Sequence, residues 1–98
     1  MITEEQAREA LKQVEDPEIG LNIIDLGLVY EIDIEGSTVS IRMTLTSPGC
    51  PVGAQLLGGA KRALEELEGV EQAKVELVWE PFWTPARVNP EYRAILGF

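Results

Sequence analysis

The 98-residue chain contains no histidine and only one cysteine, Cys50. Without histidine the chain lacks the commonest general base and the commonest zinc ligand. One cysteine cannot form an internal disulfide, and this usage without a secretory signal is typical of a reducing cytoplasm. We therefore expect a cytoplasmic protein whose chemistry uses Cys50, carboxylates, hydroxyl groups or the backbone.

Basic residues and long apolar runs are also scarce. The 8 Lys and Arg residues are scattered along the chain, and against 17 Asp and Glu they leave a net charge of −9. A field of this sign repels phosphate backbones, so no nucleic-acid partner is expected. No apolar run approaches the ~20 residues that cross a bilayer, so no membrane partner is expected either. The length predicts a single domain over residues 1–98.

Hydrophobic periodicity predicts the first half of the fold. Thr3 and Gln6 fit a capping box that starts a helix. Residues 16–27 lack a clean period and are predicted to form an ordered, packed loop. Period-two alternation then predicts strands over 28–35 and 39–45, joined as a hairpin at Gly36-Ser37. In these strands Leu28, Tyr30 and Ile32 face the core, whereas Ser40, Arg42 and Thr44 face outward.

The second half of the chain changes to a helical period. Pro51 is placed at the first helical position, and Gly69 ends this helix. A third strand over 70–79 follows, parallel to the second because the connection is a helical crossover. A short helix near 90–96 closes the chain. The order α-β-β-α-β-(α) predicts an α/β fold, more closely an α+β two-layer sandwich, with a small mixed three-stranded sheet covered on one face by helices.

Three glycines interrupt the long helix. Gly53, Gly58 and Gly59 each cost about 1 kcal/mol relative to alanine. Close approach of the helix backbone to the sheet or to another subunit would explain them, and packing is favoured over ligand approach. Approach of the helix to another subunit would make the protein a homodimer.

Cys50 lies in the run Thr46-Ser47-Pro48-Gly49-Cys50-Pro51, between a predicted strand and a predicted helix. Unpaired amide groups and the positive end of the helix dipole favour a thiolate there. Such sites lower a cysteine pKa from about 8.5 to roughly 3.5–7.5. Cys50 is therefore either a reactive thiol, able to attack an electrophile or bind a soft metal, or a small apolar residue that fills a tight corner.

Three carboxylates and a hydroxyl group are candidate neighbours of Cys50. If the packed loop folds over the sheet edge, Asp16, Glu18 and Asp25 would approach the sulfur. The alternative is that Asp16 and Asp25 cap local turns. Thr46 either donates a hydrogen bond to the thiolate or caps the loop.

Three of the six aromatic residues fall within residues 79–83. Trp79 is predicted to lie in the core. Phe82 and Trp83 follow in a proline-bounded segment that leaves the sheet, so at least one is predicted to be exposed and to contact a protein partner. The alternative is that both cover the edge of the core.

The number of possible ligands limits what metal the chain can hold. A stable iron–sulfur cluster needs about four ligands, normally thiolates. One chain supplies one cysteine, and a symmetric dimer supplies two. No stably bound cofactor is therefore expected. Cys50 would contact iron or a cluster only transiently, or together with thiols from outside.

Three blocks of sequence carry a resemblance to a known family. They are Asp16-Pro17-Glu18-Ile19 with the following Ile24-Asp25-Leu26-Gly27-Leu28-Val29, Thr46-x-x-x-Cys50-Pro51, and Trp79-x-Pro81-x-Trp83. In this order they resemble the SufT/PaaD-type family of iron–sulfur cluster assembly factors, in a short, single-domain form. The resemblance implies a compact α/β domain that helps to mature iron–sulfur proteins and is not a conventional enzyme. Cys50 then matches the family's reactive cysteine, and Asp16, Glu18, Asp25 and Thr46 match its acidic and threonine positions.

Three functions remain open at this point. The first is an accessory factor that docks on assembly machinery or client apoproteins and uses the Cys50 thiolate. The second is an adaptor in which Cys50 is structural and the aromatic segment binds the partner. The third, a thiol-dependent catalyst, is the weakest because the chain lacks histidine as a general base.

Overall fold

The computed structural model describes residues 2–17, 19–46 and 52–96. Cys50 and Glu18 lie outside the described residues. The elements follow in the order α1 (Glu4–Leu11), β1 (Glu15–Asp16), β2 (Leu21–Asn22), β3 (Val29–Glu35), β4 (Thr38–Met43), α2 (Gly53–Glu65), β5 (Gln72–Leu77), the 3-10 helix η1 (Pro85–Arg87) and α3 (Pro90–Leu96).

The main sheet has the order β3-β4-β5, with β4 in the centre. The antiparallel pair β3–β4 is the predicted hairpin, and Gly36 has the positive φ of 59° that its tight turn requires. β5 runs parallel to β4, with Val39 opposite Ala73 and Ile41 opposite Val75. The predicted mixed three-stranded sheet is confirmed.

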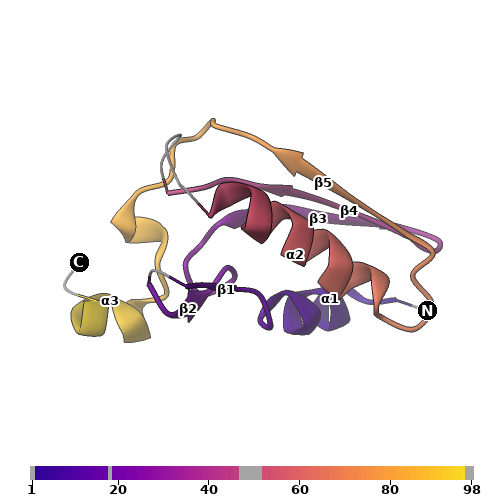
Figure 1. Ribbon diagram of the computed structural model, residues 1–98, viewed down its shortest axis with the longest axis horizontal. Coiled ribbons are helices and arrows are strands. Elements are labelled where there is room, and N and C mark those ends of the chain that lie inside the picture. Colours follow the sequence, from indigo (N-terminus) through magenta and orange to yellow (C-terminus); the bar gives the residue numbers. More distant parts are fainter. Residues whose placement is uncertain (1, 18, 47–51, 97–98) are drawn as a thin grey trace.

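Both long helices lie on one side of this sheet, whereas β1, β2 and α3 gather at the end of the molecule away from the amino terminus (Figure 1). The helices and the sheet bury one apolar cluster between them, and its fully buried members include Leu11, Ile41, Leu56 and Leu64. The two-layer arrangement is therefore the predicted one. No helix among the described residues has the length and apolar character needed to cross a bilayer.

The first helix starts as predicted. The Thr3 side chain accepts a hydrogen bond from the Gln6 amide at 3.1 Å, and the Gln6 side chain accepts one from the Thr3 amide at 3.0 Å. These reciprocal bonds form a capping box and satisfy two amides that the first turn leaves unpaired. Ile2 and Ala7 are both buried beside it.

The second helix begins later than predicted. Val52 is its N-cap residue and Gly53 its first residue, so Pro51 is not at the first helical position. Gly53 has an internal packing reason, because an added Cβ would lie 2.7 Å from Leu45 Cδ1, whereas one at Gly59 would make an ordinary contact with Val14 Cγ1 at 3.4 Å.

The alternation in the hairpin fails at two places. The register of the hairpin shifts between Val29 and Glu31, and Val29 packs against the core. Tyr30, which was predicted to face the core, donates a hydrogen bond to the Pro81 carbonyl. Thr44, predicted to face outward, is fully buried. The reason is that β4 ends at Met43, so the pleat that would have turned Thr44 outward does not continue.

The packed loop predicted over residues 16–27 begins with a small hairpin. Asp16 pairs with Leu21 across β1 and β2, and Ile23 and Leu26 are buried in the turns that follow. Only the packing was predicted, because two-residue strands are too short to give a period.

Candidate functional site

The described residues on either side of the Cys50 segment are Thr46, beyond the carboxyl end of β4, and Val52, the N-cap of α2. Val52 has no side-chain group that can accept hydrogen bonds from the first-turn amides, and that turn contains no acidic residue. The positive end of the α2 dipole is therefore not neutralised by the helix's own side chains. A negatively charged group just before Val52 would be stabilised.

A buried hydroxyl group lies next to the strand end. The Thr44 backbone amide donates to the Leu28 carbonyl at 2.8 Å, but Thr44 Oγ1 has no hydrogen-bond partner within the described parts of the chain. A buried unpaired hydroxyl costs about 1–3 kcal/mol. The sequence alternation did not predict this buried hydroxyl, because it placed Thr44 on the solvated face.

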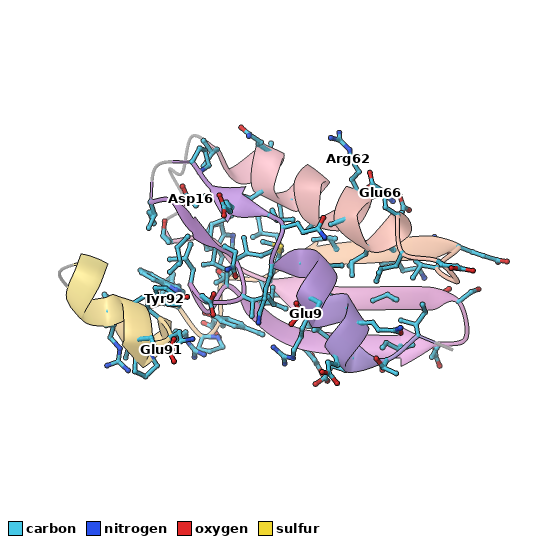
Figure 2. All side chains as sticks on the ribbon, turned by 90° about the horizontal axis from the view of Figure 1, so that it is seen from below. Glu9, Asp16, Arg62, Glu66, Glu91 and Tyr92 are labelled. Atoms are coloured by element: carbon cyan, nitrogen blue, oxygen red, sulfur yellow. The ribbon has the colours of Figure 1, made fainter. Side chains whose placement is uncertain are left out.

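Asp16 is the only ionisable side chain buried among the described residues, with 2% of its surface exposed. Its backbone carbonyl accepts hydrogen bonds from the amides of Ile19 and Gly20, at 3.2 and 2.7 Å, and so forms the turn between β1 and β2. Figure 2 shows the side chain on β1, at the end of the molecule where β2 and α3 also lie. Gly20 has the positive φ, 80°, that this turn uses.

Asp25 uses both carboxylate oxygens in internal hydrogen bonds. Asn22 Nδ2 donates to Oδ2 at 2.7 Å, and Asn89 Nδ2 donates to Oδ1 at 3.1 Å. The Asn89 amide also donates to the Asp25 carbonyl at 2.7 Å. Asp25 therefore joins the turn after β2 to the segment before α3. Only the contact with Asn22 is local, as the turn-capping alternative expected, whereas the contacts with Asn89 are long-range.

The described carboxylates do not form a metal site by themselves. In residues 2–17, 19–46 and 52–96, no group of three or more Cys, Asp or Glu side chains is arranged to hold a metal ion. The predicted approach of Asp16, Glu18 and Asp25 to Cys50 remains a hypothesis, since Glu18 and Cys50 are outside these ranges. Thr46, half-buried, is the last described residue before Cys50 in the sequence.

The structure separates the two aromatic candidates. Trp83 packs against the core and its Nε1 donates to the Leu26 carbonyl at 2.6 Å, whereas Phe82 is 67% exposed. Phe82 is the only large hydrophobic side chain exposed among the described residues. Trp79 packs against the core as predicted. The segment is thus held by Trp83 and presents Phe82 to solvent.

Sequence reasoning missed how residues 81–89 are fixed to the β2–β3 connection. Gly27 has a φ of 75°, and an added Cβ there would collide with the Arg87 carbonyl oxygen and lie 2.7 Å from Arg87 Cβ. The Arg87 guanidinium lies 4.5 Å from the centre of the Tyr30 ring, in cation–π geometry. Gly27 was visible in the sequence as a glycine before a strand, but nothing local indicated its distant neighbour.

The fold and the site define a small α+β domain that carries its single thiol between a central strand and a helix. The family described as iron-sulfur cluster assembly protein has a model that matches residues 4–77. Since this range covers most of the chain, the protein belongs to that family. The match ends before Phe82 and Trp83.

Relatives agree with this assignment and confirm the resemblance. The chain is 43% identical over 89 residues to the Fe-S protein maturation auxiliary factor YitW of Bacillus subtilis, covering 90% of this chain and 87% of that protein. It is 39% identical over 83 residues to the Fe-S protein maturation auxiliary factor SufT of Staphylococcus aureus, covering 84% and 94%. A hypothetical protein of Thermotoga maritima has the same fold, with a TM-score of 0.88, 43% identity and coverage of 99% and 96%.

Proposed function

We propose that this protein is an accessory factor in the maturation of iron–sulfur proteins, and that the Cys50 thiolate makes a transient bond to iron, to a cluster or to a client. The iron or cluster is the cargo and not a resident cofactor. In this role the protein is an assembly factor and not an enzyme. Its family membership and its similarity to two maturation factors support the general role.

One observation carries the role of the thiol. The only sulfur nucleophile in the chain falls just before a helix whose amino end has neither a capping side chain nor an acidic first turn. That environment favours a thiolate, which is the form that binds iron. One thiolate gives one of about four ligands, so a donor or client must supply the others, and the bond is suited to exchange.

The neighbouring residues have supporting roles in this proposal. Asp16 and Asp25 shape the loop, through the β1–β2 turn and the contact with Asn89. Glu18 and Thr46 would adjust the polarity around the sulfur. We place the protein in the cytoplasm, with assembly machinery or client apoproteins as partners. A homodimer would bring two thiols to one cluster.

A pure adaptor is the second candidate function, and the exposure of Phe82 favours it. In that case Cys50 is structural and the aromatic segment carries the activity. Thiol-based catalysis is the remaining alternative, and it has less support because the chain has no histidine to act as a base.

Deletion and rescue test the general role. In cells that lack the protein, iron–sulfur enzymes should lose activity while enzymes without clusters keep theirs, and the full chain should restore the loss. Equal activity of both enzyme classes in the deletion strain, under iron limitation as well as in rich medium, would contradict the proposal.

Phe82→Ser tests the docking role of the exposed aromatic. Because Phe82 is largely exposed, the change should leave the melting temperature unaltered, but about tenfold more protein should be needed to restore iron–sulfur enzyme activity. Trp83→Phe is the matched control. It removes the donor to the Leu26 carbonyl and should cost about 1–3 kcal/mol of stability while leaving the required amount of folded protein unchanged. If Phe82→Ser restored activity at the same amount of protein as the unaltered chain, this side chain would have no docking role.

A further inference from the structure

A groove runs between α1 and α2 on the side of the molecule away from the sheet. It consists of two adjoining hollows of about 530 and 580 Å³, which share Gln13, Ala63 and Glu66 in their lining. Figure 2 looks onto this side and shows the two helices next to each other, with Glu9 on α1 and Arg62 and Glu66 on α2. The aromatic segment around Phe82 does not line this groove.

The lining is small at its base and acidic at its rim. Ala10, Ala63 and Gly59 leave little side-chain volume between the helix backbones. Four carboxylates line the two hollows against one basic residue, Arg62, and they are Glu5, Glu9, Glu15 and Glu66. Of these, only Glu9 forms an ion pair within the described residues, with Lys12 at 3.4 Å.

Gly58 gives a second, independent indication. It is exposed, it lines the groove, and a Cβ added there would meet no described atom within 4 Å. A glycine inside a helix is unfavourable relative to alanine, and neither internal packing nor a positive φ explains this one. Close approach of another backbone from outside would explain it.

We propose that the α1–α2 groove is a docking site for a basic helical segment of a partner protein. Helices pack at 8–10 Å with the spacing set by the residues at the contact, so small residues at the base admit a helix closely. The unpaired carboxylates at the rim complement lysine or arginine on such a segment. A second copy of this chain is a poor occupant because each copy carries a net charge of −9.

The length of α2, which forms one wall of the groove, sets the length of segment that can lie along it. α2 has 13 residues, which corresponds to a length of ~20 Å. A partner helix of about 13 residues would lie along it and place three or four basic side chains at the rim. This inference does not depend on Cys50, so it can fail while the iron–sulfur role stands.

A peptide titration tests the proposal on the full chain. The probe is a helical peptide of about 14 residues with alanine and leucine on one face and lysine on the flanks, and the comparison peptide carries glutamate in place of lysine. Binding is followed by amide chemical shifts of the isotope-labelled protein. We expect saturable shifts confined to α1 and α2 for the lysine peptide, weakened on raising salt from about 0.05 to about 0.5 M, and none for the glutamate peptide.

Variants show whether the groove itself binds the probe. Gly58→Leu should weaken binding of the lysine peptide at least about tenfold, because the leucine side chain would occupy the space that the peptide backbone needs. Gly58→Ala should raise the melting temperature by about 3–5 °C, because the side chain meets no described neighbour. Glu5→Gln with Glu66→Gln should weaken binding several-fold, whereas Glu35→Gln with Glu71→Gln, an equal charge change elsewhere, should not.

Three results would overturn the proposal. They are shifts spread over the acidic surface outside α1 and α2, equal binding by Gly58→Leu and the unaltered chain, and a concentration-dependent dimer that Gly58→Leu abolishes. The last result would assign the groove to a second copy.

Discussion

Gly27→Ala is expected to lower the free energy of unfolding by about 2–5 kcal/mol. Part of this loss is the cost of a left-handed backbone angle for alanine, since Gly27 has a φ of 75°. The rest comes from the collision of the new Cβ with the Arg87 carbonyl, a backbone atom that no side-chain rotation can move. For a domain whose total stability is about 5–15 kcal/mol, this is a large fraction.

Gly36→Ala is the matched control for that prediction. Gly36 also has a positive φ, 59°, but an added Cβ would meet no described atom within 4 Å. Its change should therefore cost only the backbone term, about 1–2 kcal/mol. Chemical denaturation of both variants measures the difference. If both variants lost the same free energy of unfolding, the close contact between Gly27 and Arg87 would not contribute to holding residues 81–89 against the β2–β3 connection.

Cys50→Ser is expected to give the largest functional loss. Iron–sulfur enzyme activity in cells that carry only this variant should fall to the level of cells without the protein. The physical reason is that an alcohol stays protonated at neutral pH and is a poor ligand for iron, although its size is close to that of the thiol.

Ser40→Ala, on β4 but outside the candidate site, is the control for Cys50→Ser and should restore activity fully. Melting curves of both proteins should match that of the unaltered chain, which separates loss of chemistry from loss of folding. Full restoration by Cys50→Ser would instead support the adaptor function and leave the thiol without a role.

Local sequence signals were sufficient to predict most of the fold. The capping box at Thr3, the alternation in β3 and β4, and the helical period of α2 depend on neighbours within one or two turns. Such signals predicted the order of α1, β3, β4, α2, β5 and α3 and the mixed sheet, but not the short elements β1, β2 and η1. They placed the start of α2 too early because Pro51 is favourable at a first helical position, whereas the helix begins at Gly53.

Long-range contacts explain what the sequence could not reveal. Asn89 binds Asp25 from 64 positions away, and Trp83 binds the Leu26 carbonyl from 57 positions away. No periodicity encodes such pairs. The sequence therefore identified Asp25 and Trp83 as notable residues but left open whether each served structure or function. The contacts give both of them a structural role.

The most direct test of the central claim is the pH dependence of Cys50 alkylation. Cys50 is the only thiol in the chain, and with no histidine present the rate of alkylation reports this sulfur without interference. We predict an apparent pKa at or below about 7.5, which rises towards the free value when the protein is unfolded in denaturant. An apparent pKa of about 8.5 or above in the folded protein would contradict the account, because the thiol would then be mostly protonated at neutral pH.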